Sequence, residues 1–206
     1  MKILNDFNTS VEKALTEIDP NWKKYPGVIV CGTHQPRPES VYDIYKEIKK
    51  AREESIPFLG ICFGMQLMAI EYAEHVLGIK NASSEEFGNE GTIIVKKMPE
   101  LRIGLCPAMV NMKIDTESFW HNYKVDIDSF PQLGDGFWIN EVNDVVTWMK
   151  LKDRENFYGV QFHPEYQSSK DKPHPVLVDF INKCKGYEKV SGSSTPITDL
   201  FKKHGK

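Results

Sequence analysis

One stretch of the chain reads Pro57-Phe58-Leu59-Gly60-Ile61-Cys62-Phe63-Gly64-Met65-Gln66, an apolar run that ends at a cysteine between two glycines. The apolar run predicts a buried parallel strand, and the apolar spacing from Met65 to Leu77 predicts a helix. Cys62 therefore falls on a tight strand-to-helix turn, where the amino end of the helix favours a thiolate and offers amide donors. Gly60 and Gly64 leave room for this turn and for a substrate. Cys62 is a candidate nucleophile, and a structural cysteine packed beside glycines is the alternative.

A second apolar run ends in a histidine with a carboxylate two residues on, in Tyr158-Gly159-Val160-Gln161-Phe162-His163-Pro164-Glu165-Tyr166. A thiolate nucleophile needs a base that takes and returns a proton, and the imidazole needs a carboxylate that fixes its tautomer. Cys62, His163 and Glu165 are thus predicted to form a catalytic triad. For this stretch alone, a hydrogen-bonded surface histidine is the alternative.

Together the two stretches resemble the class I (triad) glutamine amidotransferases, and within them most closely the glutaminase domain of CTP synthase. The segments Ile70-Glu71-Tyr72-Ala73 and Asn81-Ala82-Ser83-Ser84-Glu85-Glu86-Phe87 are similar to the CTP synthase version in particular. The similarity covers residues 27–183 with gaps. It implies a flavodoxin-like α/β sandwich, with a central, mostly parallel sheet flanked by helices and a small antiparallel β-meander.

The resemblance also implies roles for individual residues. Cys62 would attack the side-chain amide carbon of glutamine, His163 would protonate the leaving ammonia and then activate water, and Glu165 would hold His163. The implied intermediate is a γ-glutamyl thioester. The backbone amides of Gly32 and Phe63 would form the oxyanion hole. The residues implied in substrate binding are Thr33, Gln66, Glu86, Asn122 and Tyr123.

Two positions depart from the family pattern. Where the family has Pro-Gly-Gly-Phe-Gly, this chain has Cys31-Gly32-Thr33-His34-Gln35, and a β-branched Thr33 would be strained at a positive φ. Asn122 stands where CTP synthases use an arginine for the glutamine carboxylate, so a charge-assisted contact of about 1.5–3 kcal/mol would be lost. Either glutamine binds more weakly, or the γ-glutamyl substrate differs at this position. Trp120, in the same segment, is a candidate to stack on a larger ligand group.

Three functions remain open at this point. The first is glutamine hydrolysis with ammonia delivered to a separate synthetase partner, which the triad and the resemblance favour. The second is a stand-alone γ-glutamyl hydrolase acting on a modified glutamine, which Asn122 and Trp120 favour. The third is a non-catalytic binding module with a relic triad, which only the altered loop at residues 31–35 favours. The complete triad places the relic last.

Length and composition limit the number of domains, the kinds of partner and the cellular compartment. The 206 residues suit one α/β domain, predicted over residues 1–184 with a flexible tail at 185–206, and leave no room for an ATP-using ligase domain. A net charge of -3 gives no basic footprint for nucleic acid, and no apolar run is long enough to span a membrane. Four cysteines without paired spacing, and no apparent signal peptide, predict reduced thiols in the cytoplasm. No metal-ligand spacing is present, so we expect neither a metal nor a cofactor.

The remaining elements follow from local patterns. Strands are predicted over residues 91–97, 101–105 and 109–114, and antiparallel pairs over 138–140, 145–149 and 157–162. Helices are predicted over residues 41–52 and 176–183. On the helix after the nucleophile, Glu71 and Glu74 are predicted on the solvated face.

Overall fold

The computed structural model describes residues 1–33 and 38–191 and is built around a six-stranded sheet with the strand order β1-β2-β3-β9-β8-β7. The parallel strands are β1 (Lys2–Leu4), β2 (Val28–Val30), β3 (Phe58–Ile61) and β9 (Phe157–Val160). Two strands, β8 (Val145–Leu151) and β7 (Phe137–Val142), continue the sheet in antiparallel fashion. The predicted α/β class with a mostly parallel sheet is confirmed.

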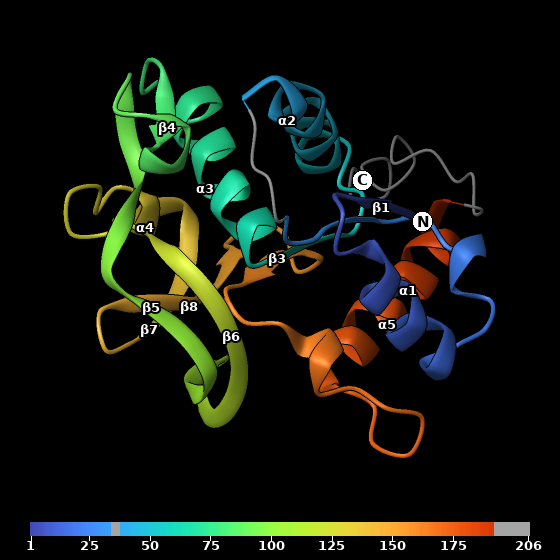
Figure 1. Ribbon diagram of the computed structural model, residues 1–206. Helices are drawn as coiled ribbons and strands as arrows, with labels where there is room; N and C mark the ends of the chain where they lie inside the picture. The colour runs from blue at the N-terminus through green and yellow to red at the C-terminus, as the bar shows by residue number, and fades with distance from the viewer. Residues whose placement is uncertain (34–37, 192–206) are drawn as a thin grey trace, which may run out of the picture.

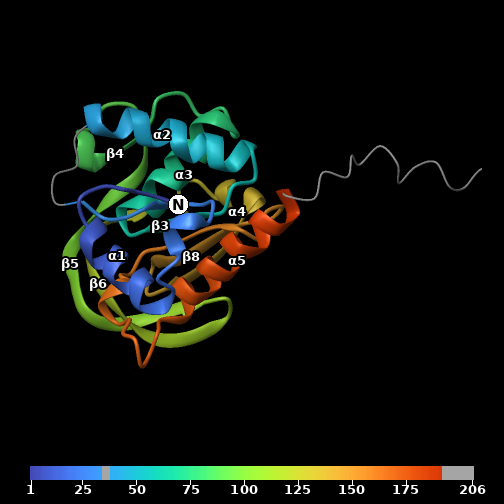
Figure 2. The same ribbon diagram turned by 90° about the vertical axis from the view of Figure 1, so that its right-hand side faces the viewer.

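Helices cover both faces of this sheet, as Figures 1 and 2 show. One face carries α2 (Pro38–Glu53) and α3 (Phe63–His75), and the other carries α1 (Asn8–Ile18) and α5 (Pro175–Ser191). Successive strand residues point to opposite faces, so Val28 and Val30 pack in one core while Ile29 packs in the other. Because both faces are covered, the central strands are apolar throughout.

The helices predicted over residues 41–52 and 176–183 are observed. Residues 41–52 lie within α2, and residues 176–183 lie within α5. The last helix runs to Ser191, past the boundary at residue 184 where the sequence predicts a flexible tail. Tyr187 fastens it there by donating a hydrogen bond to the carbonyl of Glu54 at 3.3 Å. The rest of the predicted tail, residues 192–206, lies outside the described residues.

A second sheet, with the order β4-β5-β6, is dominated by the long hairpin of β5 (Thr92–Val110) and β6 (Lys113–Val125) beside β4 (Ala82–Ser84) (Figure 1). The strands predicted at 91–97 and 101–105 are parts of β5. The strand predicted at 109–114 is wrong, because Asn111 (φ 47°) and Met112 (φ 66°) form the hairpin turn. This turn lacks a glycine, and Met109, Val110 and Ile114 around it are apolar, so the local pattern resembles a strand.

The prediction that Glu71 lies on a solvated face is also wrong. Glu71 is 1% exposed and pairs with Arg52 of α2, whose Nε and Nη2 lie 2.9 and 2.8 Å from its carboxylate oxygens. Glu74 is exposed as predicted. The helix α3 is therefore buried on the side that faces α2 as well as on the side that faces the sheet.

Among the described residues, four short helical turns complete the fold. They are η1 (Trp22–Lys24), η2 (Glu85–Phe87), α4 (Leu133–Gly136) and η3 (Pro164–Tyr166). Across residues 1–33 and 38–191, no helix has the length and apolar character needed to cross a membrane.

Candidate active site

Cys62 occupies the predicted turn between β3 and α3. Its φ of 54° and ψ of -108° are uncommon for a residue other than glycine, and such strain persists only where the surroundings hold it. The Cys62 N–H donates to the carbonyl of Val160 at 2.8 Å, which ties the turn to β9. A methyl group on Gly60 would lie 2.7 Å from the backbone of Gly64, and one on Gly64 would overlap the carbonyl of Val30. Both glycines are therefore needed for the close packing of this turn.

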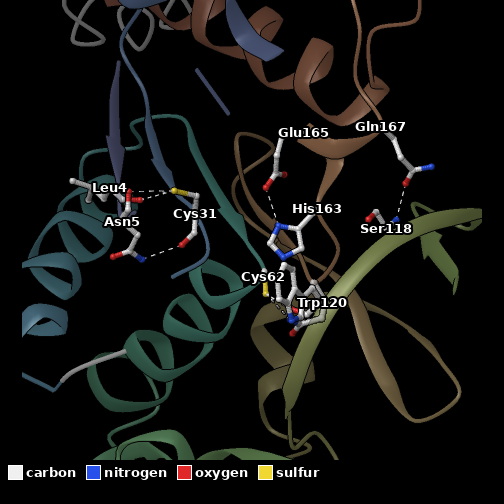
Figure 3. Close-up of polar contacts among 10 residues, drawn as sticks. Leu4, Asn5, Cys31, Cys62, Ser118, Trp120, His163, Glu165 and Gln167 are labelled. Atoms are coloured by element: carbon white, nitrogen blue, oxygen red, sulfur yellow. Dashed lines mark hydrogen bonds and ion pairs between the residues drawn. The ribbon is translucent and has the colours of Figure 1, made fainter. Parts of the chain in front are cut away.

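His163 and Glu165 lie where β9 ends and η3 begins. Nδ1 of His163 is 2.8 Å from Oε1 of Glu165, and the two residues are 1% and 5% exposed. Figure 3 shows one ring nitrogen turned toward Glu165 and the other toward Cys62. The backbone N–H of His163 donates to the carbonyl of Ser118 at 2.8 Å, so β6 also fixes this histidine. The structure thus brings the three predicted triad residues together.

Two aromatic rings hold the imidazole of His163 in place. The Tyr166 ring stacks on it with a centroid separation of 5.0 Å and an interplanar angle of 22°. The Phe7 ring contacts it at 5.7 Å and 59°. Two ring contacts and the carboxylate leave the imidazole little rotational freedom.

The protonation state of His163 reflects opposing effects. Burial disfavours the imidazolium, but the hydrogen bonds and charges of Cys62 and Glu165 outweigh burial and raise the pKa of His163 to about 10. The imidazolium is therefore the form at neutral pH. Such a group can give a proton to a leaving amine.

The two predicted oxyanion donors flank the triad. A methyl group on Gly32 would lie 3.2 Å from Cε1 of His163 and 2.7 Å from the Phe7 ring, so the chain just after β2 passes beside the imidazole. Phe63 is the first residue of α3, and the first amides of a helix have no acceptor within it. The role of both amides as oxyanion donors stays a prediction. Of the altered loop, residues 34 and 35 lie outside the described residues.

Gln66 and Glu86 are two of the residues predicted to bind substrate. Gln66 is 2% exposed, and its Nε2 donates to the carbonyl of Tyr123 at 2.9 Å and to Oε1 of Gln161 at 3.2 Å. Glu86 lies in η2, where burial raises its pKa to about 7.

Burial raises the pKa of Tyr123, and the charges of Glu86 and Glu85 raise it further. Asn122 has a buried Oδ1 without a hydrogen-bond partner among the described residues, and Thr33 is half-buried after Gly32. Their roles in substrate binding stay predictions.

The structure shows two polar contacts of the Cys62 sulfur and one buried imidazole that the sequence analysis did not assign. Nε2 of Gln161 lies 3.6 Å from Sγ of Cys62, and the carbonyl of Trp120 lies 3.8 Å from the same sulfur. His121 is buried, and its Nδ1 lies 2.8 Å from the carbonyl of Tyr123. Burial lowers the pKa of His121 to about 4, so this second imidazole is neutral. A polar residue directly after the apolar strand β9 was the available signal for Gln161.

The site contains no set of metal ligands in the part of the chain that the structure describes. Within those residues, no three or more histidine, cysteine, aspartate or glutamate side chains are grouped to hold an ion. The four cysteines are free thiols.

The model of the class I glutamine amidotransferase family matches residues 4–183, and the chain belongs to this family. It is similar to CTP synthases. That of Thermotoga maritima is 33% identical over 86% of this chain and 38% of the relative, and that of Bdellovibrio bacteriovorus is 35% identical over 77% and 34%. The chain thus spans little more than a third of the length of these relatives.

A solved structure shares the fold. The glutaminase domain of Trypanosoma brucei CTPS, solved with bound acivicin, superposes with a TM-score of 0.77 at 23% sequence identity. The match covers 88% of this chain and 89% of that one. The class I glutamine amidotransferase fold predicted from the two site stretches is confirmed.

Proposed function

We propose that this chain hydrolyses the side-chain amide of glutamine through a γ-glutamyl thioester on Cys62, releasing glutamate and ammonia. The observation that carries the proposal is the arrangement of Cys62, His163 and Glu165. The buried imidazole is held 2.8 Å from a carboxylate, and its other nitrogen is turned toward a sulfur on a strained turn (Figure 3). Membership of the class I glutamine amidotransferases supports this chemistry.

In the first half of the reaction, the Cys62 thiolate attacks the amide carbon, and the carbonyl oxygen becomes an oxyanion. The backbone amides of Gly32 and Phe63 donate to that oxyanion. The His163 imidazolium gives its proton to the amide nitrogen, the carbon–nitrogen bond breaks, and ammonia leaves. The raised pKa of His163 favours the protonated form that this step needs.

In the second half, neutral His163 accepts a proton from water while the water oxygen attacks the thioester carbon. The carbon–sulfur bond then breaks, which returns the thiolate and the imidazolium and releases glutamate. Glu165 keeps the proton on Nδ1 throughout, so the other ring nitrogen stays available for both transfers.

Substrate recognition falls to the residues around η2 and β6. The Glu86 carboxylate would bind the α-ammonium group, while Thr33, Asn122 and Tyr123 would surround the amino-acid end. The effect of the Glu86 charge on the pKa of Tyr123 supports a common subsite. We assign Gln66 chiefly the role of holding Tyr123 and Gln161, because its Nε2 donates hydrogen bonds to the carbonyl of Tyr123 and to Oε1 of Gln161.

The ammonia acceptor would be a separate synthetase chain. The likeness to CTP synthases supports this proposal, because an amide-hydrolysing domain supplies ammonia that a synthetase can use. We also propose that the protein is cytoplasmic, because the four cysteines of the chain form no disulfide.

Glutamate release from glutamine by the purified chain tests the proposal. Cys62→Ala should abolish release, while Cys106→Ala, which removes a half-buried cysteine of β5, should retain it. Addition of a synthetase partner should raise turnover. Undiminished release by Cys62→Ala would contradict the mechanism.

A stand-alone γ-glutamyl hydrolase is the second candidate, favoured by Trp120. This residue is 51% exposed although its carbonyl lies 3.8 Å from Sγ of Cys62, so an aromatic surface adjoins the nucleophile. A hydrolase of this kind should cleave a γ-glutamyl compound with a bulky amide substituent faster than glutamine. Trp120→Ala should then remove the preference and leave glutamine turnover unchanged.

A further inference from the structure

We infer that the side-chain amide of Gln161 is a catalytic group of this site that donates a hydrogen bond to the Cys62 sulfur and stabilises the thiolate, and that Gln66 is the positioning residue that orients it. Gln161 is fully buried, and its Nε2 lies 3.6 Å from Sγ of Cys62. The inference rests on the proposed role of Cys62 as nucleophile.

The hydrogen-bond chain through the two glutamines has only one consistent direction. Nε2 of Gln66 carries two N–H groups, and its two acceptors are the carbonyl of Tyr123 at 2.9 Å and Oε1 of Gln161 at 3.2 Å. Turning the Gln161 amide over would place its N–H groups against the N–H of Gln66 and its oxygen against the sulfur. Two donors would then face each other in a buried site. Gln66 therefore forces the nitrogen of Gln161 toward Cys62.

Both glutamines are fixed by regular structure. Gln66 lies in the first turn of α3, and its own N–H donates to the carbonyl of Cys62 at 3.3 Å. Gln161 follows β9 directly, and its N–H donates to the carbonyl of Thr147 in β8 at 3.1 Å. The two amides thus approach the nucleophile from the helix and from the neighbouring strand, on backbone that has little freedom to move.

The Cys62 thiolate needs such a donor because Cys62 is almost wholly buried. Cys62 is 7% exposed, and a buried anion is costly unless hydrogen bonds replace its hydration. His163 supplies one hydrogen bond, but it loses that proton when ammonia leaves. The amide of Gln161 does not ionise, so its N–H remains on the sulfur when the thioester breaks and the thiolate re-forms. Both donors therefore act on the thiolate, and only His163 also transfers a proton in the cycle.

Alkylation of Cys62 by iodoacetamide, followed across pH by peptide mass spectrometry, measures thiolate formation without any substrate. We expect Gln161→Met to move the midpoint of the alkylation profile up by about one to two pH units, the shift that loss of one hydrogen bond to a charged group produces. Glutamine turnover should fall about tenfold or more with it. Gln161→Glu keeps the shape of the side chain and sets a carboxylate against the sulfur, so its midpoint should rise as well. Gln66→Met, which frees the Gln161 amide to turn, should shift the midpoint in the same direction by less.

Thr147→Val is the matched control. It removes a buried hydroxyl that donates to the carbonyl of Met109 at 2.8 Å, on the strand that pairs with Gln161, but it touches no atom of Cys62. It should lower the melting temperature and leave the midpoint unchanged. A midpoint equal to that of the wild type in folded Gln161→Met and Gln161→Glu, or an equal shift in Thr147→Val, would overturn the inference. Failure of the proposed function is distinguishable, because the wild type would then release no glutamate while the alkylation shift persisted.

Discussion

Oε1 of Glu165 lies 2.8 Å from Nδ1 of His163, with both side chains almost wholly buried between the end of β9 and the start of η3. Oε2 of Glu165 has no hydrogen-bond partner among the described residues. Within the described residues, the Glu165 carboxylate therefore forms a hydrogen bond with His163 alone, where it orients the imidazole and favours its protonated form.

Replacing Glu165 by glutamine should lower the pKa of His163 from its value near 10, because a neutral amide removes both a charge and an acceptor. Less imidazolium would be present at neutral pH, and the neutral ring would no longer be held in the tautomer with the proton on Nδ1. We expect kcat for glutamine to fall by about 10²-fold or more. In a pH profile of kcat, the loss of activity at high pH should begin at lower pH in the variant. Glu155→Gln, at an exposed carboxylate paired with Lys150, is the control, and an identical basic limb in both variants would contradict the assignment.

We expect Glu86 to add a second, separate pH dependence to glutamine turnover. Burial raises the pKa of Glu86 to about 7, so the carboxylate is mostly protonated below this pH and ionised above it. If it binds the α-ammonium of glutamine, kcat/KM should rise as the pH increases through about 7. Glu86→Gln should lower kcat/KM and flatten this rise, while the exposed Glu90→Gln should retain it. A rise that persists in Glu86→Gln would assign it to another group.

Gly32 is tested by adding one methyl group. In Gly32→Ala the new methyl would lie 2.7 Å from the Phe7 ring and 3.2 Å from Cε1 of His163, so the ring or the imidazole must move. A displacement of the general acid should reduce kcat by about 10²-fold with a smaller change in KM. Gly186→Ala on α5 has open space around the new methyl and should retain full activity. Wild-type kcat in Gly32→Ala would show that the chain after β2 tolerates side chains beside the imidazole.

The three proposed catalytic residues could be identified from the sequence because they follow strand ends. The apolar runs before Cys62 and His163 identify two buried strands, and the pairing of β3 with β9 as parallel neighbours brings their carboxyl ends together. The glycines around Cys62 added the local signal of a tight turn. The fold class followed from the family resemblance that these stretches carry.

Features that depend on partners distant in the sequence were missed or wrongly predicted. The role of Gln161 becomes visible only when Gln66 of α3 is placed 3.2 Å from its oxygen. Glu71 reads as a solvated helix residue until Arg52 of α2 is known to face it. In both cases a buried polar group is explained by its partner, and a single sequence does not place that partner.

The Arg52–Glu71 pair should stabilise the packing of α2 on α3. The side chain of Glu71 is fully buried and that of Arg52 is 14% exposed, so removing one partner leaves a charge with poor solvation. We expect Arg52→Leu to lower the free energy of unfolding by about 3–5 kcal/mol. The double variant with Glu71→Leu should recover much of this loss, since it removes both charges. Urea titrations measure the difference, with the exposed Glu74→Gln as control, and additive losses in the double variant would contradict a buried ion pair.

Trapping of a γ-glutamyl group on Cys62 tests the proposed mechanism at its covalent step. The purified chain would be mixed with glutamine, quenched in acid during turnover and digested, and the Cys62 peptide analysed by mass spectrometry. We expect a mass increment of one glutamyl group on the Cys62 peptide. The increment should be absent from Cys62→Ser. It should be enriched in Glu165→Gln if this variant slows hydrolysis more than acylation. Steady release of glutamate without any adduct on Cys62 in the wild type or in Glu165→Gln, together with turnover by Cys62→Ser, would contradict the proposed mechanism.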